Sequence, residues 1–278
     1  MTYADFLLIF LISPLIALGV ILRRRLLDHR FLALTGGLTL VALIYMAPWD
    51  HTAAVWDLWT WAPGRTWGAR WWDVPPEEYL FCILEALLAS TLIYAMLLWR
   101  GRIVSSAQPR REARPLRGDA VTTLAAGALI ASAQAGWSYL PFLLVWALPV
   151  IGIQWALGGR YLWRERRVWP WVALVLCAYF TLADAVAISA GVWSFDARAL
   201  AGVALGPVPL EEILFYLLTS LMVTQGFIAL WYGFADREAL MLRVRRRVGR
   251  LASLRRVGAS RASAPTSAEH AQGAHDGR

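Results

Sequence analysis

Residues 75–85 read PPEEYLFCILE, and residues 209–219 read PLEEILFYLLT. Both stretches place two adjacent glutamates after a proline and at the start of a long apolar run. The second stretch follows the first by 134 positions without a gap, and the same offset pairs Asp50 with Asp184. The chain therefore contains an internal repeat that preserves acidic residues as well as apolar ones.

The composition is typical of a polytopic membrane protein. The chain has 278 residues, is 59% hydrophobic and has a mean hydropathy of +0.51, whereas soluble domains are about 45–50% apolar. Its formal net charge is +8, and no basic residue is a Lys, which excludes Schiff-base chemistry on a lysine. No P-loop, GxGxxG or GxSxG motif is present, and the two Cys and four His suggest no metal site.

Hydropathy predicts an all-α fold with about seven membrane-spanning helices, because one span needs about 20 mostly apolar residues. The predicted spans are residues 5–22, 31–48, 76–99, 119–136, 139–157, 169–189 and 209–232. Arginines gather in every second connection, at 23–30, 100–118 and 158–168, and in the C-terminal tail. By the positive-inside rule, we expect a multi-pass protein of the cell membrane with its N-terminus outside and its C-terminus in the cytoplasm.

The repeat predicts how these spans are organised. The offset maps the first three spans onto the last three, and one unpaired span between them restores the orientation of the second unit. The sequence thus predicts two parallel three-helix repeats related by an axis along the membrane normal. The predicted parts are a first repeat at 1–99, an Arg-rich linker and connector helix at 100–137, a second repeat at 138–235, and a basic, largely disordered cytoplasmic tail at 236–278.

The repeated carboxylates are candidates for acid–base chemistry. Carboxylates are rare inside membrane segments and are usually functional there. Apolar surroundings disfavour the charged form of a carboxyl, and a second carboxylate nearby disfavours it further, so that a protonated acid can stand beside an ionised base. The candidate catalytic residues are Asp50, Glu77, Glu78, Asp184, Glu211 and Glu212.

The glutamates also fit a structural role at the start of a helix. Proline suits the first helical turn, and Glu in that turn is favoured by the helix dipole and can cap the helix. A cap does not require an Asp and a Trp at fixed distances in both copies, so we favour the catalytic interpretation. Which glutamate of each pair is the acid and which repeat supplies it are left open.

Four aromatic residues repeat in register with the carboxylates. They are Trp59, Trp193, Phe81 and Phe215. Ring faces stabilise cations within about 6 Å, so these residues are candidates to bind substrate and stabilise a cation, with core packing as the alternative. The other Trp residues near the first copy are expected at the membrane interface: Trp49, Trp56, Trp67, Trp71 and Trp72.

Repeated three-helix units with a Pro-x-Glu-Glu helix start, preceded by an Asp and a Trp, resemble the lycopene cyclase domain of the heterodimeric-type carotenoid cyclases. The resemblance covers nearly the whole chain outside the linker and tail, and the chain looks like the two subunits of that type fused into one. In the first copy, the second residue of the Pro-x-Glu-Glu motif is Pro76, where the second copy has Leu210. This change does not disturb the glutamates.

The resemblance implies a lycopene β-cyclase, an intramolecular lyase or isomerase of carotenoid biosynthesis that closes linear carotenoid ends to β-ionone rings by redox-neutral acid–base chemistry. It implies no cofactor, neither flavin nor nicotinamide, and no metal. The implied partners are lycopene or a longer linear carotenoid, the lipid bilayer and other enzymes of the same pathway, with no role for nucleic acid. The number of ends cyclised and the ring type are left open.

Two other functions fit parts of the pattern. A membrane prenyltransferase would hold Mg²⁺ and a diphosphate with carboxylates, but such enzymes carry spaced Asp-rich motifs with basic neighbours. Here adjacent glutamates lie on the Arg-poor side. A small-solute transporter can share the plan of three, one and three spans, but its site lies near the midplane of the membrane, whereas these carboxylates gather at one face.

Overall fold

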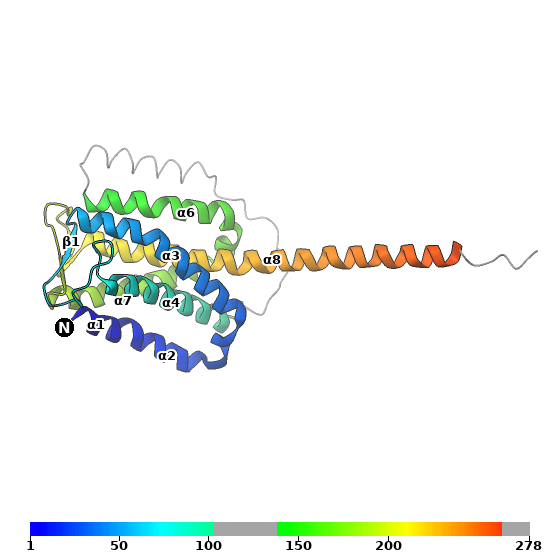
Figure 1. The fold of residues 1–278 in the computed structure, drawn as a ribbon, viewed down its shortest axis with the longest axis horizontal. Coiled ribbons are helices and arrows are strands. Elements are labelled where there is room, and N and C mark those ends of the chain that lie inside the picture. Colours follow the sequence, from blue (N-terminus) through cyan, green and yellow to red (C-terminus); the bar gives the residue numbers. More distant parts are fainter. Residues whose placement is uncertain (103–137, 263–278) are drawn as a thin grey trace, which may run out of the picture. The chain divides into compact units, whose positions relative to one another are not determined.

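The computed structural model of the chain describes residues 1–102 and 138–262 (Figure 1). It separates into two compact units, Met1–Tyr232 and Gly233–Arg278, and the first unit holds every predicted site residue. Residues 1–99 and 138–232 therefore belong to one unit and share one hydrophobic core.

Within the described residues, six helices are long and apolar enough to cross a membrane. They are Tyr3–Leu22, His29–Val55 (α3), Pro76–Trp99 (α4), Tyr139–Arg164 (α6), Trp169–Ser189 (α7) and the part of α8 at Leu210–Arg237. Each overlaps a predicted span, which confirms the all-α polytopic membrane fold. The predicted span at 119–136 lies outside the described residues.

The remaining elements are short. The first span consists of α1 (Tyr3–Leu7), a π-helical stretch (Leu8–Ile12) and α2 (Ser13–Leu22), and a 3₁₀ helix (Arg23–Leu27) follows it. The strands are β1 (Trp59–Trp61), β2 (Trp193–Phe195), β3 (Ala204–Leu205) and β4 (Val208–Pro209). They form two antiparallel pairs, β1 with β2 and β3 with β4.

Two helices run further than hydropathy predicted. Helix α3 continues past residue 48 to Val55, because Pro48 removes only one backbone N–H. The Thr52 hydroxyl additionally donates to the Pro48 carbonyl at 2.8 Å. Helix α8 runs from Leu210 to Ala262. The prediction of a largely disordered tail from residue 236 is thus wrong for 236–262, where Leu, Ala, Arg and Glu favour a helix. Residues 263–278 lie outside the described part.

Two tyrosines of α3 and α7 donate to backbone carbonyls close to prolines of other spans. Pro14 has no N–H to offer the preceding turn, and the hydroxyl of Tyr179 in α7 donates to the carbonyl of Phe10 at 2.8 Å. Tyr45, the repeat equivalent of Tyr179, donates to the carbonyl of Trp146 in α6, next to the Val145 carbonyl that Pro149 leaves without its helical donor. Each tyrosine therefore joins one copy of the repeat to a helix of the other.

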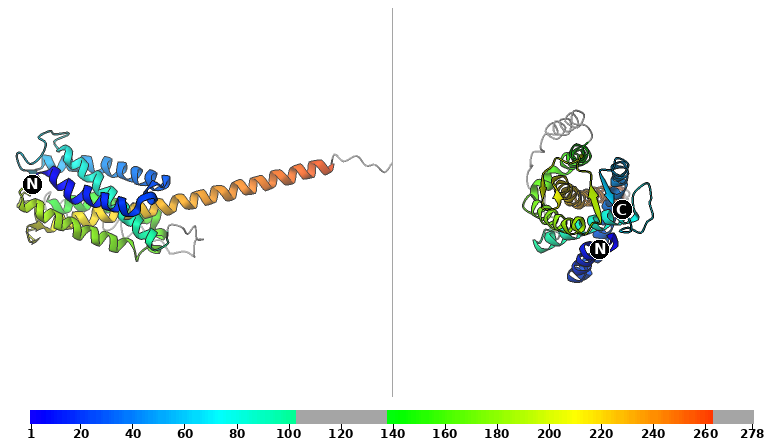
Figure 2. Two further views of the ribbon diagram at one scale, coloured as in Figure 1. Left: turned by 90° about the horizontal axis from the view of Figure 1, so that it is seen from below. Right: turned by 90° about the vertical axis from the view of Figure 1, so that its left-hand side faces the viewer.

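The two copies also meet directly at equivalent positions. Strand β1 pairs with β2 so that Thr60 lies opposite Ser194, its own repeat equivalent. Deeper in the bundle, the hydroxyl of Thr219 donates at 2.6 Å to Glu85, which is 134 residues away in the sequence. An approximate two-fold axis that passes through both pairs would bring equivalent residues into contact in this way. The spans lie side by side in both views of the first unit (Figures 1 and 2).

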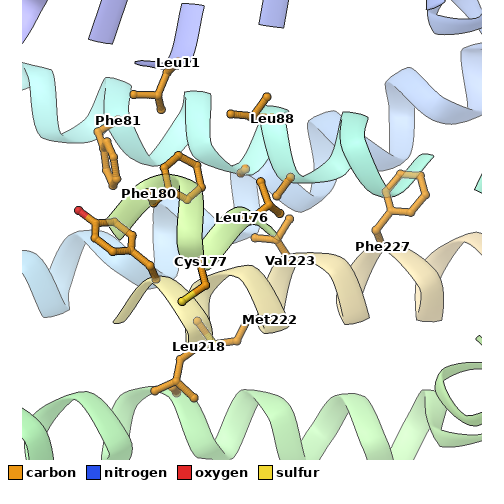
Figure 3. Close-up of a cluster of buried hydrophobic side chains, with 14 of the residues drawn as sticks. Leu11, Phe81, Leu88, Leu176, Cys177, Phe180, Leu218, Met222, Val223 and Phe227 are labelled. Atoms are coloured by element: carbon orange, nitrogen blue, oxygen red, sulfur yellow. The ribbon is translucent and has the colours of Figure 1, made fainter. Parts of the chain in front are cut away.

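The hydrophobic core lies between α4, α7, α8 and the first span. Figure 3 shows Leu11, Phe81 and Phe180 of this core close to one another, with Phe227 farther along α8. Many large apolar side chains remain exposed on the outer faces of the spans, among them Ile21, Leu157 and Leu182. Such exposure is costly in water but suits hydrocarbon, which agrees with helices that face lipid.

Candidate active site

A cavity lies between the starts of α1, α4, α6 and α8 and the C-terminal part of α3, and residues of β1 and β2 also line it. Its lining contains three carboxyl groups, three tyrosines and seven other aromatic side chains from both copies of the repeat. The lining residues are Tyr3, Trp49, Asp50, Trp59, Trp61, Glu78, Phe81, Tyr139, Trp193, Phe195, Glu212, Phe215 and Tyr216.

Glu78 lies in the first turn of α4 and accepts two hydrogen bonds on one oxygen. The hydroxyl of Tyr3 donates to its Oε2 at 2.8 Å, and the indole Nε1 of Trp61 donates to the same atom at 3.1 Å. Both donors favour the ionised form of a carboxyl. Among the described residues, no side chain donates to Oε1 of Glu78.

Glu212 occupies the equivalent position in α8 but has fewer donors. The hydroxyl of Tyr139 donates to its Oε1 at 2.5 Å, as Tyr3 does to Glu78. The repeat equivalent of Trp61 is Phe195, which has no N–H to donate. The two copies of the site are therefore alike in shape but unequal in hydrogen bonding.

The two aspartates differ as well. Asp184 is fully buried and accepts a hydrogen bond from the indole Nε1 of Trp193 at 2.8 Å. Asp50 is 2% exposed, lines the cavity, and its Oδ2 has no hydrogen-bond partner among the described residues. Asp50 shares the cavity lining with Glu78 and Glu212.

The first glutamate of each pair lies outside the cavity. Glu77 accepts a hydrogen bond from the backbone N–H of Trp67 at 2.5 Å, and Glu211 accepts one from that of Ala201 at 2.6 Å. Both are fully buried. Trp67 and Ala201 are themselves repeat equivalents, so each copy uses this glutamate to fasten the loop that precedes its helix.

All four predicted aromatic residues line the cavity, and two of them pack across the repeats. The ring of Tyr3 lies 5.1 Å from that of Trp193, and the ring of Tyr139 lies 5.5 Å from that of Trp59. Phe81 and Phe215 complete opposite parts of the wall. Each tyrosine thus donates to a glutamate of its own copy while it supports a tryptophan of the other.

Sequence reasoning missed several residues of the wall. Tyr3 and Tyr139 are equivalent, but their offset is 136, so a gapless alignment at 134 does not pair them. Trp61 and Phe195 do align at 134, and their shared aromatic character was the available signal.

The assignment of Trp49 to the membrane interface is wrong. Trp49 is 6% exposed and stacks on Phe142, Trp146 and Phe215. It lies inside because α3 continues past Pro48 and turns this position towards the other copy. In the described part of the chain, no group of three or more His, Cys, Asp or Glu residues is arranged to hold a metal ion.

Comparisons with known proteins agree with this arrangement. The family model for lycopene cyclase matches residues 1–97 and 138–229. A lycopene beta-cyclase of Halobacterium salinarum is 35% identical over 234 residues, which are 82% of this chain and 94% of that protein. Bifunctional lycopene cyclase/phytoene synthases of Aspergillus oryzae and Aspergillus niger are 25% and 26% identical, and the match spans 34% and 35% of their lengths.

No solved structure matches the chain significantly. The family match falls into two segments that correspond to the two copies of the repeat, and each segment contains one of the repeated Asp residues and one pair of glutamates. The chain belongs to the lycopene cyclase family.

Proposed function

We propose that this protein is a lycopene β-cyclase that closes the ends of a linear carotenoid inside the membrane. The observation that carries the proposal is the cavity in which Asp50, Glu78 and Glu212 face aromatic rings from both copies of the repeat. Acid and base groups in an aromatic wall suit a reaction that begins and ends with a proton transfer and passes through cations. The name of the Halobacterium relative supports the same activity.

The reaction needs only a donor and an acceptor of protons. An acid protonates the terminal double bond of the carotenoid, which leaves a tertiary cation. The neighbouring double bond attacks this cation, and the new carbon–carbon bond closes a six-membered ring and moves the cation to the next carbon. A base then removes the proton from the carbon that formed the new bond, which gives the β double bond with no net redox change.

The four carboxyl groups nearest the cavity are the source of the acid and the base: Asp50, Glu78, Asp184 and Glu212. The faces of Trp59, Trp193, Phe81 and Phe215 stabilise the intermediate cations and exclude water that would capture them. Glu77 and Glu211, candidates for catalysis by their sequence, act on the reaction indirectly, because they hold the loops above the cavity.

The setting of the reaction follows from the spans and the arginines. The protein resides in the cell membrane with its cavity towards the outer face and its C-terminus in the cytoplasm, because the Arg-rich connections lie at the other end of the spans. Its substrate is lycopene or a longer linear carotenoid that enters from the lipid, and other enzymes of the pathway are its neighbours. No cofactor is needed, because the chemistry moves protons only.

Expression of the full chain in cells that accumulate lycopene tests this function. We expect the colour to change from red to orange-yellow and chromatography to show products with β rings, with one or two rings depending on how many ends react. The Glu78→Gln/Glu212→Gln double variant, present in the membrane at an equal amount, is the matched control and should leave the cells red. Unchanged lycopene with the unaltered chain would refute the function.

A further inference from the structure

We propose that the two copies of the site are chemically unequal, with Asp50 as the general acid and Glu78 as the base. This inference rests on the proposed cyclase function and assigns roles within it. The repeat alone does not assign these roles, because each copy contains an equivalent aspartate and an equivalent glutamate. The roles follow from the position of each carboxyl on its helix and from the donors that reach it.

Helix position separates the aspartates from the glutamates. Glu78 lies in the first turn of α4, which begins at Pro76, and a helix N-terminus favours a negative charge. Asp50 lies in the penultimate turn of α3, which ends at Val55, far from the helix start at which a negative charge is favoured. In each copy, the glutamate is therefore the better base and the aspartate the better acid.

Hydrogen-bond donors strengthen the role of Glu78 as the base. Its Oε2 accepts from both Tyr3 and Trp61, whereas Glu212 accepts from Tyr139 alone because Phe195 replaces the second donor. Two donors on one oxygen stabilise the carboxylate. They also hold the group in place, so that Oε1, to which no described residue donates, remains to accept the proton from the substrate.

For the aspartates, the residue of the second copy is the one that receives a hydrogen-bond donor. Trp193 donates to Asp184, which stabilises its carboxylate, and Asp184 does not line the cavity. Asp50 lines the cavity, and among the described residues no side chain donates to it. A buried carboxyl without a donor is most stable when protonated. Asp50 is therefore the carboxyl that both holds a proton and reaches the substrate.

The proton balance closes within the cavity. Asp50 transfers its proton to the terminal double bond and becomes a carboxylate, while the neighbouring double bond closes the ring. Glu78 removes the proton that leaves the ring and becomes a carboxylic acid. Because Asp50 and Glu78 line the same cavity, return of that proton from Glu78 to Asp50 resets the site, and no proton is consumed.

A matched pair of variants tests the inequality of the copies. Asp50→Asn and Asp184→Asn make the same change at equivalent buried positions, so packing costs are similar. We expect Asp50→Asn to lower the cyclisation rate by about 100-fold or more, the scale of a lost general acid, and Asp184→Asn to lower it by less than about tenfold. Rates are measured on membranes that contain equal amounts of each full-length variant. Equal losses would overturn the inference.

Solvent deuterium separates the acid from the base. Membranes with Glu78→Gln or Asp50→Asn are incubated with lycopene in D₂O, and the recovered lycopene is analysed by mass spectrometry. With Glu78→Gln, Asp50 still delivers a deuteron, the cation returns to lycopene without closing to product, and label accumulates in the substrate. With Asp50→Asn, no label should enter. Label with Asp50→Asn, or its absence with Glu78→Gln, would overturn the assignment.

Failure of the inference differs from failure of the proposed function. Reversed or equal behaviour of the variants would leave a cyclase with different roles for its carboxyl groups. A chain that produces no rings from lycopene in its unaltered form would instead refute the function itself.

Discussion

Adjacent glutamates take different roles because they lie on one helical turn. Successive side chains on an α-helix point in directions about 100° apart, so Glu77 and Glu78 cannot face the same neighbour. Glu77 reaches back to the backbone N–H of Trp67, and Glu78 faces the cavity. The second copy repeats this division with Glu211 and Glu212.

We predict that Glu78→Gln reduces cyclisation strongly and that Glu212→Gln reduces it less, while both variants remain in the membrane. The amide preserves the size of the side chain and its acceptor oxygen but cannot exchange a proton as a carboxyl does. Typical general acid–base contributions are about 100- to 10,000-fold. Product chromatography from lycopene-making cells measures the effect, and near-normal product from both single variants would remove these glutamates from the mechanism.

Glu77→Gln and Glu211→Gln are the matched controls for that measurement. Their role requires an acceptor for a backbone N–H, and the glutamine carbonyl retains one. We expect a clearly smaller loss than at Glu78. A larger loss at Glu77 and Glu211 would mean that the first glutamate of each pair, and not the second, exchanges protons with the substrate.

At the scale of the element, the spans depend on tyrosines that pair with backbone carbonyls. Pro14 cannot donate to the turn before it, and lipid offers no water to replace the missing donor. Tyr179 supplies a hydroxyl to the carbonyl of Phe10 from a helix of the other copy. The irregular first span is therefore stabilised by tertiary contact.

We predict that Tyr179→Phe destabilises the protein by about 1–3 kcal/mol, the cost of leaving a partly buried backbone carbonyl without its donor. Thermal unfolding in detergent measures the change. Pro14→Ala should recover part of the loss, because an alanine at this position brings a backbone N–H to the same turn.

The specificity of this rescue has its own control. Tyr45→Phe removes the equivalent hydroxyl, which donates to Trp146 instead, and Pro14→Ala should not rescue it. Rescue of both tyrosine variants to the same degree would mean that Pro14→Ala stabilises the first span for an unrelated reason.

For the whole molecule, the two copies of the repeat interlock at the site. Tyr3 packs on Trp193, Tyr139 packs on Trp59, and β1 pairs with β2. Neither copy can build the cavity wall alone, and a lone copy would expose its carboxyl groups to lipid at considerable cost.

We predict that the chain can be cut between the copies without loss of function. Fragments 1–108 and 109–278, co-expressed in lycopene-making cells, should restore the colour change, because the cut interrupts no predicted span and removes no site residue. The control is each fragment by itself, which should leave the cells red. Cyclisation by a single fragment would mean that each copy is an independent active site.

We predict that the C-terminus is cytoplasmic and that the loop before α4 is outside. A reporter that is active only on the outer side should be silent when fused at Arg278 and active when inserted near Gly64. The expectation follows from the arginines at the inner connections. The reverse pattern would invert the protein and move the carboxyl groups to the cytoplasmic face.

The sequence by itself determined the membrane class, the positions of the six described spans within a few residues at most ends, and the candidates at Asp50, Glu78 and their equivalents. These features depend on local composition, because the transfer of an apolar run into lipid does not require knowledge of its neighbours. The repeat added long-range information, since a gapless offset marks residues that are kept for a shared reason.

Only the tertiary structure decided which side chains meet. The burial of Trp49, the donors from Tyr3 and Trp61 to Glu78, and the covering of Asp184 by Trp193 each depend on how a helix or loop packs against another. Identical motifs in the two copies therefore acquire different surroundings. Hydrogen bonds and burial depend on neighbours that are distant in sequence, and these neighbours make two equivalent carboxyl groups chemically unequal.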